Sequence, residues 1–406
     1  MVIFQINTVY NSGSTGRIVA DLKHMLERNG HICYVAYGRG NYNEENTCRI
    51  SNKRDLYMHA LLTRITDKTG FYSVYATKKL IRKIKDTNPD IIHLHNIHGY
   101  YLHVGYLFRF LQDYGKPVVW TLHDCWSYTG HCVHYVQYDG YRMCDKWKSK
   151  CRKCERSAEY PKSWKDNSTW NYIHKRQYFT QIEKMDIVTV SRWLDQQVSE
   201  SFLRKYSTHV IYNGVDLQKF KIKKNIDLKQ KNDIGNKKVI LGVANVWTEA
   251  KGLNDFVELS KILNKNEYQI VLIGVNEKQM DRLPQEILGL PRTDNIEDLV
   301  DWYNIAEVYF NASKAETFGM TVIEALACGT PVVTYDVCAM KEILTDNCGF
   351  VIEEDKGMNA IVQCIVKCDK QRMEKNCIER SKLFEKNLQY EKYMELYRKI
   401  LTEVGN

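Results

Sequence analysis

Short runs of β-branched and other apolar residues alternate along the chain with segments whose apolar residues recur every three or four positions. The short runs predict strands, and the segments between them, such as 16–28, 252–263 and 321–327, predict helices. This alternation is typical of the α/β class, in which parallel sheets carry helices on both faces. The predicted strands fall into two sets: 2–6, 32–37, 90–94, 118–122, 186–190 and 209–212, followed by 239–244, 269–274, 286–290, 308–311, 331–334 and 350–352.

The two sets of strands predict two doubly wound, Rossmann-like domains, because 406 residues exceed what one hydrophobic core usually holds. Residues 1–212 would form the first domain and residues 239–380 the second. The lysine-rich stretch 213–238 has no apolar period and reads as a linker or lead-in. Residues 381–406 predict a C-terminal amphipathic helix, with an apolar repeat over 381–401, that packs across the domains. Such sheets bind ligands at the carboxyl ends of their strands, so we expect the domains to face each other across a cleft.

The composition, with 44% hydrophobic and 26% charged residues, is that of a soluble globular protein. No apolar run reaches the roughly 20 residues that a membrane-spanning helix needs. The start, "MVIFQINTVY", lacks a basic region followed by a long apolar region, so no signal peptide is expected. The 13 cysteines are mostly scattered singly, which favours a reducing, cytoplasmic setting.

Positive charge is concentrated in the first half of the chain. Residues 1–210 contain 31 Lys and Arg against 19 Asp and Glu, whereas the remainder contains 27 against 30. The excess lies mainly in 53–85 and 142–165, and an anionic partner would be membrane headgroups or nucleic acid. Segment 53–85 also mixes aromatic, aliphatic and cationic residues, as interfacial helices do. The alternative is a solvated basic face over ordinary core residues.

Two loops that follow predicted strands in the first half carry candidate chemistry. In "NTVYNSGSTGRIVADL", Gly13, Ser14, Thr15 and Gly16 form a small-residue loop that lets the backbone approach a phosphate or a sugar. The alternative is a simple turn in which Ser14 or Thr15 caps the following helix. In "TLHDCW", His123 lies where a strand ends and can orient a hydroxyl, or it is bonded only to nearby backbone.

Two further loops lie in the second half. In "GVANVWTEAKGLNDF", Lys251 precedes a predicted helix start, which suits a diphosphate; a surface lysine is the alternative. In "ETFGMTVIEALACGTP", Glu316 and Glu324 lie on either side of backbone N–H groups that can face a phosphate. One carboxylate on each side of a phosphate site suits a nucleotide-sugar, whose ribose and hexose flank the diphosphate. A capping box of Thr321 and Glu324 is the alternative, and it leaves Glu316 unexplained.

In this order and spacing, the motifs resemble those of the retaining glycosyltransferases of family 4, which have the GT-B fold of two facing Rossmann-like domains. The resemblance covers nearly the whole chain and is carried by "RNGH", "TLHD", "VTVSRWL", "VIYNGVD", "AKGL", "ETFGMTVIE" and "EALACGTPVV". It implies transfer of a hexose from a UDP- or GDP-sugar with retention at the anomeric carbon. No metal or other cofactor would be required for catalysis.

The resemblance also implies roles for single residues. Glu316 would contact the donor hexose and Glu324 the ribose, while Lys251 would neutralise the departing diphosphate. His123 would lie beside the reacting sugar, and the loop from Gly13 to Gly16 would close over the acceptor. We expect a further group of residues to bind the donor: Phe318, Gly319, Met320, Thr321, Asn245 and Arg292.

One departure from the family concerns the phosphate site. Many members have an arginine shortly before the lysine, and this chain has Asn245 in that region. Phosphate binding would then depend on Lys251, backbone amides and a further cation such as Arg292.

An insert at about 125–165 is rich in cysteine. Cys132, Cys144, Cys151 and Cys154 have the spacing C-x11-C-x6-C-x2-C, which predicts a structural zinc site. Such a site would stabilise the insert rather than perform chemistry. Unliganded or disulfide-paired cysteines are the alternatives.

We therefore expect a retaining glycosyltransferase that acts on a lipid-linked or polysaccharide acceptor in bacterial surface polysaccharide assembly. It would be cytoplasmic and peripheral on the inner face of the membrane, with an anionic membrane surface and no nucleic acid as partner. Two alternatives remain open. One is a nucleotide-sugar epimerase or hydrolase on the same fold, and the other is a zinc-containing nucleic-acid-binding or regulatory protein, which would leave the ordered set of loops unexplained.

Overall fold

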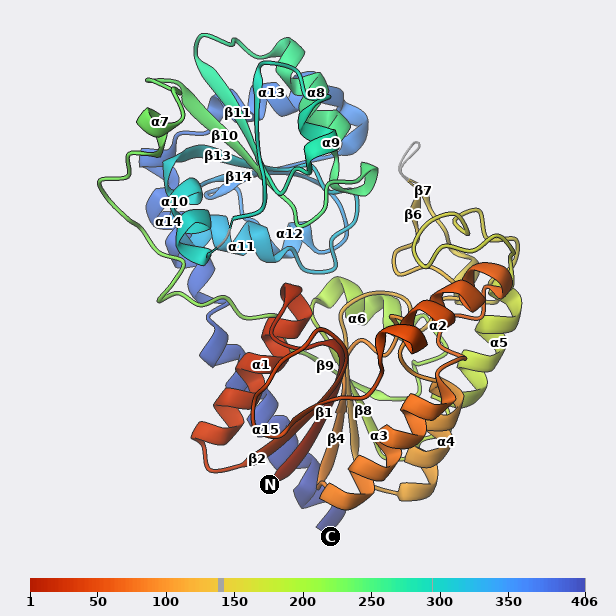
Figure 1. Ribbon diagram of the computed structural model, residues 1–406. Helices are drawn as coiled ribbons and strands as arrows, with labels where there is room; N and C mark the ends of the chain where they lie inside the picture. Colours follow the sequence, from red (N-terminus) through yellow and green to blue (C-terminus); the bar gives the residue numbers. More distant parts are fainter. Residues whose placement is uncertain (138–141, 294, 406) are drawn as a thin grey trace. The chain divides into compact units, whose positions relative to one another are not determined.

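The computed structural model describes residues 1–137, 142–293 and 295–405. They divide into two compact units, and each contains its own parallel sheet (Figure 1). The first unit contains Met1–Tyr135, Met143–Tyr212 and the C-terminal residues from Tyr390. The second contains Asn213–Gln389.

The first unit has a seven-stranded sheet in which all neighbouring strands are parallel. In spatial order its strands are β3 (Thr47–Arg49), β2 (Ile32–Arg39), β1 (Val2–Val9), β4 (Ile91–Leu94), β5 (Val118–Leu122), β8 (Met185–Thr189) and β9 (Ser207–Val210). Its helices are α1 (Gly13–Arg28), α2 (Lys53–Thr66), α3 (Val74–Thr87), α4 (Val104–Tyr114), α5 (Ser168–Phe179), α6 (Arg192–Ser199) and the part of α15 (Lys386–Gly405) that begins at Tyr390.

Helices cover both faces of this first sheet. α1 and α15 lie on one face, and α3 and α4 lie on the other (Figure 1). β4 and β5 are buried along their whole length, as expected for parallel strands covered on both sides. On the α1 face, one hydrophobic cluster joins Ile3 and Val35 of the sheet to Leu22 of α1 and Tyr397 of α15. The end of the chain is therefore part of the first unit's core.

The second unit has a six-stranded sheet that is also parallel throughout. Its spatial order is β12 (Ile287–Leu290), β11 (Tyr268–Ile273), β10 (Lys238–Val243), β13 (Ala306–Asn311), β14 (Val332–Tyr335) and β15 (Gly349–Ile352). Its helices are α7 (Leu228–Lys231), α8 (Leu253–Ile262), α9 (Glu277–Met280), α10 (Ile296–Ile305), α11 (Met320–Ala327), α12 (Met340–Ile343), α13 (Gly357–Lys367) and α14 (Lys370–Lys382), with the short 3₁₀ helices η2 (Glu249–Lys251) and η3 (Glu354–Lys356).

Both sheets reverse their strand order at one point. The reversal lies between β1 and β4 in the first sheet, and between β10 and β13 in the second. Loops that leave neighbouring strands in opposite directions diverge there, and doubly wound sheets bind their ligands at this position. The predicted α/β class is thus confirmed, and the loops of interest follow β1, β4, β10 and β13.

Some sequence-based expectations about helix ends were wrong. α1 begins at Gly13 and its N-cap residue is Ser12, so neither Ser14 nor Thr15 caps it. The C-terminal helix expected over 381–406 is α15, which begins five residues later at Lys386, and α14 ends before it at Lys382. Residues 213–238, expected as a linker or lead-in, belong to the second unit and contain α7.

The cysteine-rich insert contains a small hairpin of β6 (Val136–Gln137) and β7 (Arg142–Met143) and the 3₁₀ helix η1 (Lys146–Lys148). Buried polar contacts connect its start to the rest of the first unit. The Asp67 carboxylate is 2.5 Å from His131 Nδ1, and it accepts a hydrogen bond from the Asn167 N–H at 2.8 Å. The Lys175 ammonium donates to the carbonyls of Trp126 and Thr129 at 2.8 and 3.0 Å. Burial lowers the pKa of Lys175 to about 7.

Across the described part of the chain, no helix combines the length and the apolar character that crossing a membrane requires.

Candidate functional site

Two loops meet at the strand-order reversal of the second sheet. The loop after β10 leads through η2 to Lys251, and the loop after β13 leads through Ser313 to Glu316. The backbones are bonded directly, since the Lys314 N–H donates to the Ala250 carbonyl at 2.9 Å. The two loops therefore form one surface at the carboxyl end of the sheet.

Gly252 allows this close approach. Its φ is +72°, which lies in the left-handed region that disfavours side chains. A Cβ atom at this position would lie 2.3 Å from the Ala312 carbonyl oxygen, so no larger residue fits without movement of the backbone. The glycine thus fixes the position of Lys251 next to the β13 loop.

Lys251 and Glu316 form an ion pair in which the ammonium bonds the carboxylate Oε1. The same ammonium donates to the Ser313 hydroxyl at 3.2 Å. The Lys251 side chain is 39% exposed and that of Glu316 is 16% exposed, so an arriving ligand can reach the ammonium more easily. The structure brings together two of the residues that the sequence singled out.

Lys314, next to these residues, has a different role. Its side chain is 9% exposed and pairs with Asp255 at 3.0 Å and Glu354 at 2.7 Å, and its ammonium lies 3.9 Å from the centre of the Tyr335 ring. These contacts join the β13 loop to α8 and η3. Lys314 therefore holds in place the loop that carries Glu316.

The start of α11 presents backbone rather than side chains. Its N-cap is Gly319 with φ of +85°, and no side chain caps the helix. Thr321 is the second residue of the helix, so the alternative capping box of Thr321 and Glu324 is wrong. The first N–H groups of a helix have no partner within the helix and carry partial positive charge, which favours an anion at this end.

Glu324 is more enclosed than Glu316. It is 7% exposed, and its Oε2 accepts a hydrogen bond from the Tyr303 hydroxyl at 3.1 Å. Burial and the nearby Glu324 charge hold the pKa of Tyr303 well above its usual range, so the phenol keeps its proton and donates. Lys370 binds the chain after Tyr303 by donating to the Ala306 carbonyl at 2.9 Å. Tyr303 was not found from the sequence, because nothing near it in the chain signals this contact.

The other donor-site candidates are spread more widely. Phe318 is 2% exposed, and its ring packs against Phe384 with centroids 5.8 Å apart, which is a core position. Met320 and Thr321 are partly buried in the first turn of α11, and Asn245 is exposed in the loop after β10. Arg292 is exposed after β12, which β11 separates from β10. The loops that carry Arg292 and Asn245 therefore follow strands that are not neighbours in the sheet.

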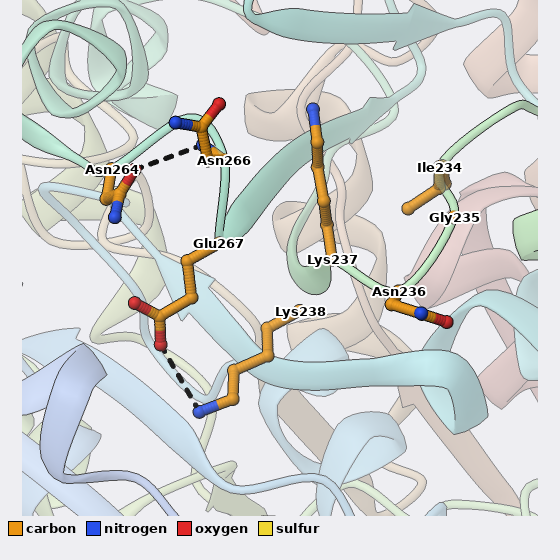
Figure 2. A pocket seen from close by; sticks show the side chains of 8 residues that line it. All are labelled: Ile234, Gly235, Asn236, Lys237, Lys238, Asn264, Asn266 and Glu267. Carbon is orange, nitrogen blue, oxygen red and sulfur yellow. Dashed lines mark hydrogen bonds and ion pairs between the residues drawn. The ribbon is translucent and has the colours of Figure 1, made fainter.

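A pocket of about 540 Å³ lies elsewhere in this unit (Figure 2). Its lining includes Lys237 and Lys238 at the start of β10 and Asn264, Asn266 and Glu267 just before β11. Lys238 and Glu267 are 3.6 Å apart across it. These are the amino ends of the strands, opposite the end where doubly wound sheets bind ligands, so the pocket is not assigned to the site.

In the first unit, the small-residue loop follows β1 directly. Its turn is tight, since the Asn11 N–H donates to the Gly16 carbonyl at 2.9 Å. Gly13 has φ of +62°, and a Cβ at Gly16 would lie 3.0 Å from Val9 Cγ2. Ser14 and Thr15 lie in the first turn of α1.

His123 follows β5 and is 8% exposed. Its Nε2 is 3.2 Å from Nδ1 of His95, whose Nε2 is 3.0 Å from the Gln5 Oε1. Burial lowers the pKa of His123 to about 4, so the ring is neutral at physiological pH. Next to it, the Asp124 carboxylate lies 2.7 Å from His98 Nε2. A cavity of about 10 Å³ beside these rings holds no more than one water.

Sequence reasoning missed His95 and Gln5. A signal was present in "IIHLHNIHG", because His93 and His95 alternate along a strand and must share one face. Their partners on β1 and β5 were not visible from the sequence.

The four cysteines of the predicted zinc site are thiols, and no cysteine of the described chain forms a disulfide. A hydrogen bond with Cys154 holds the pKa of Cys132 well above its usual range, and the same bond lowers that of Cys154 to about 7. The Gly130 N–H donates to Cys151 Sγ at 3.2 Å. Among residues 1–137, 142–293 and 295–405, however, no group of three or more His, Cys, Asp or Glu side chains is arranged to hold a metal ion.

Comparison with known families and structures agrees with the fold. The family model described as "Glycosyltransferase Family 4" matches residues 15–219, and the one described as "Glycosyl transferases group 1" matches residues 224–384. A solved sucrose-phosphate synthase from Thermosynechococcus elongatus superposes with a TM-score of 0.72 at 16% identity, covering 99% of both chains. Anabaena HepE in complex with UDP-glucose superposes with a TM-score of 0.66 at 15% identity, covering 98% of this chain and 100% of that one. These likenesses confirm the predicted GT-B fold.

Among curated proteins, the chain is similar to the putative colanic acid biosynthesis glycosyl transferase WcaC of Escherichia coli K12. The two are 24% identical over 393 residues, which is 89% of each chain. The capsular polysaccharide biosynthesis glycosyltransferase CapM of Staphylococcus aureus is also 24% identical, over 183 residues that cover 42% of this chain and 48% of CapM.

Proposed function

We propose that this chain, which belongs to glycosyltransferase family 4 and is a glycosyltransferase, moves a hexose from a UDP- or GDP-sugar to a glycan acceptor in bacterial surface polysaccharide assembly. The ion pair of Lys251 and Glu316 at the strand-order reversal of the second sheet carries this proposal. The names of WcaC and CapM support the polysaccharide, and the UDP-glucose complex of HepE supports the donor class.

In the proposed donor complex, the diphosphate lies against the Lys251 ammonium and the first N–H groups of α11. These groups bind negative charge that grows as the sugar–phosphate bond breaks, which is where electrostatic stabilisation lowers the barrier. Glu324, held by Tyr303, accepts hydrogen bonds from the ribose hydroxyls. Glu316 exchanges its contact with Lys251 for hydroxyls of the hexose. Arg292 and Asn245 supply further polar contacts.

Transfer then proceeds with retention. The acceptor hydroxyl oxygen forms a bond to the anomeric carbon on the face from which the diphosphate leaves, and the departing phosphate oxygen takes the hydroxyl proton. No protein carboxylate is assigned as a nucleophile, because Glu316 faces Lys251 and Glu324 binds Tyr303. His123 binds a sugar hydroxyl beside the reacting carbon, and the loop from Gly13 to Gly16 contacts the acceptor.

Replacing Glu316 tests the proposal. Glu316→Gln removes the charge but keeps the shape, and we expect turnover to fall about 100-fold while binding of the nucleoside diphosphate is retained. Glu258→Gln, at an exposed position of α8 in the same unit, is the matched control and should keep wild-type turnover. Unchanged turnover of Glu316→Gln with an active nucleotide-sugar would remove its role.

We propose that the outward face of α2 contacts an anionic membrane surface. This helix has an inverted pattern, since it buries His59 and Thr63 but exposes Tyr57, Leu61 and Ile65 at 75%, 47% and 47%. The exposed residues are four positions apart and form one stripe.

Trp164, 75% exposed, is joined to the end of α2 by a hydrogen bond from its backbone N–H to the Arg64 carbonyl at 2.8 Å. Exposed Lys53, Arg54 and Arg64 accompany the stripe, as is typical of helices that lie on anionic membranes.

We also retain a structural zinc at Cys132, Cys144, Cys151 and Cys154 as a proposal. The contact between Cys132 and Cys154 supports it, while the described side chains do not form a complete metal-binding group. Elemental analysis of the purified protein decides, because one zinc per chain is expected and its absence would end the proposal.

A further inference from the structure

Three side chains on neighbouring strands of the first unit form one hydrogen-bonded chain. Gln5 lies on β1, His95 directly follows β4, and His123 directly follows β5. Gln5 Oε1 and His95 Nε2 are 3.0 Å apart, and His95 Nδ1 and His123 Nε2 are 3.2 Å apart. All three are buried, with exposed fractions of 0%, 1% and 8%. Water therefore cannot easily replace either contact.

The Gln5 amide, which begins this series of hydrogen bonds, has a fixed orientation. The Gln5 amide nitrogen donates to the Val19 carbonyl at 3.2 Å and also reaches Cys33 Sγ at 3.2 Å. A carbonyl can only accept a hydrogen bond, so the nitrogen must face Val19 and the oxygen must face His95. Rotating the amide by 180° would place two acceptors together at Val19.

This orientation determines both histidine tautomers. Gln5 Oε1 can only accept, so His95 must carry its proton on Nε2. In a neutral imidazole the other nitrogen is then an acceptor, so His95 Nδ1 receives a hydrogen bond from His123 Nε2. His123 consequently has its proton on Nε2 and a lone pair on Nδ1.

These tautomers exist only in neutral rings, and burial keeps the rings neutral. Burial lowers the pKa of His123 to about 4 and holds that of His95 well below its usual range. The neighbouring His93 ring, with centroids 4.0 Å from that of His95, has a pKa lowered to about 3 by burial. The rings of His93, His95 and His123 are therefore all neutral at pH 7.

The geometry points to Gln5 and His95 as positioning residues that hold His123 in the Nε2–H tautomer, so that the ring has a lone pair and not an N–H group at the buried Nδ1. This inference rests on the proposed function, in which His123 contacts the reacting sugar. The opposite tautomer would present an N–H group at this position, which can only donate and therefore cannot accept the proton of a sugar hydroxyl. A protonated ring would oppose the positive charge that develops at the anomeric carbon during glycosyl transfer.

Nitrogen-15 NMR of the histidine rings in the full chain tests the tautomer without any activity measurement. A His123→Gln variant assigns the His123 signals by their loss. We expect the wild-type ring to show a protonated Nε2 and an unprotonated Nδ1 at pH 7. A proton on Nδ1, or on both nitrogens, would overturn the inference whether or not the enzyme transfers sugar.

Breaking the chain of contacts at its far end tests the role of the positioning residues. Gln5→Met removes the acceptor but keeps a side chain of similar length. We expect the His123 signals to report a mixture of tautomers, with kcat about tenfold lower and KM for the nucleotide-sugar changed less than twofold. Tyr397→Phe is the control, because it breaks a buried 2.7 Å hydrogen bond to His93 in the same unit and leaves the three-residue chain intact. It should keep both the tautomer and kcat.

The two proposals fail in different ways. If Gln5→Met leaves the His123 tautomer unchanged, the positioning role is wrong even when transfer is observed. If the tautomers are as inferred but neither the wild type nor any variant transfers sugar, the proposed function is wrong. If Gln5→Met does not fold, the wild-type spectrum still decides the tautomer.

Discussion

Asp124 shows how one buried residue is tuned by its neighbours. Burial acts to raise the pKa of its carboxyl, but the His98 ring at 2.7 Å and the Trp126 N–H at 2.9 Å outweigh burial and lower it to about 2. In the unfolded chain the pKa returns to about 3.8, the usual value. Between these values the unfolded state binds more protons than the folded state, so stability falls as pH falls.

This gives a prediction for acid unfolding. The stabilisation from Asp124 should be complete above about pH 4 and decline toward pH 2, by about 2 kcal/mol in total. Thermal unfolding between pH 2.5 and 6 should therefore depend less on pH in Asp124→Asn than in the wild type. Asp86→Asn, at an exposed position of α3, is the control and should keep the wild-type pH dependence. Equal pH profiles for wild type and Asp124→Asn would contradict the assignment.

At the level of residues, the sequence located single groups that follow strands better than contacts between strands far apart in the chain. Lys251 and Glu316 were found because each follows a strand, and parallel strands bring their ends together. Gln5 and His95 were missed because their contact joins strands 90 positions apart in the chain. Nothing in the local pattern of either strand identifies its spatial neighbour.

At the level of elements, apolar periodicity predicted all strands longer than three residues, with each end within three positions of the observed one. It did not predict β3, β6 and β7, which are two or three residues long. The alternative of a capping box at α11 is wrong because Gly319, with a positive φ, is the N-cap and the helix begins at Met320, so Thr321 lies inside it. The expected C-terminal helix is present as α15 but begins five residues later, at Lys386, because Leu383 to Glu385 separate it from α14.

The turn that leads into α8 can be tested by matched glycine substitutions. Gly252→Ala places a Cβ in the left-handed region and 2.3 Å from the Ala312 carbonyl oxygen. Gly235→Ala imposes the same φ preference, but no atom lies within 4 Å of the new Cβ. We expect Gly235→Ala to lower the free energy of unfolding by about 1 kcal/mol and Gly252→Ala by about 3 kcal/mol. Chemical denaturation measures both, and equal losses would mean that the close approach has no energetic consequence.

The α2 face gives a second test at this level. The double variant Leu61→Ser with Trp164→Ser should reduce cosedimentation with vesicles containing phosphatidylglycerol about tenfold, since two apolar side chains no longer enter the interface. Added salt should weaken wild-type binding, because the neighbouring basic residues act electrostatically. The control, Ile262→Ser with Val366→Ser, changes two residues of similar exposure in the second unit. Equal binding of both double variants would exclude α2 as the membrane contact.

At the level of the whole molecule, the two units share the same strand order around their reversal points but differ in charge. The basic excess lies in residues 1–210, the part that contains α2 and the cysteine-rich insert. Family membership excludes the alternative of a non-enzymatic nucleic-acid-binding protein. The sequence predicted two separate sheets because each sheet has its own complete alternation of strands and helices. The choice of sugar and acceptor depends on contacts between side chains and ligand. No sequence pattern specifies these contacts.

Calorimetric titration of the full chain with UDP and with GDP tests the central claim most directly. We expect one of the two to bind, with its affinity at least tenfold weaker in Lys251→Met and in Glu324→Gln. Lys261→Met, at an exposed position of α8, should bind like the wild type. If neither nucleotide binds, or if Lys251→Met and Glu324→Gln bind as tightly as the wild type, the second unit does not hold a nucleotide-sugar at these residues.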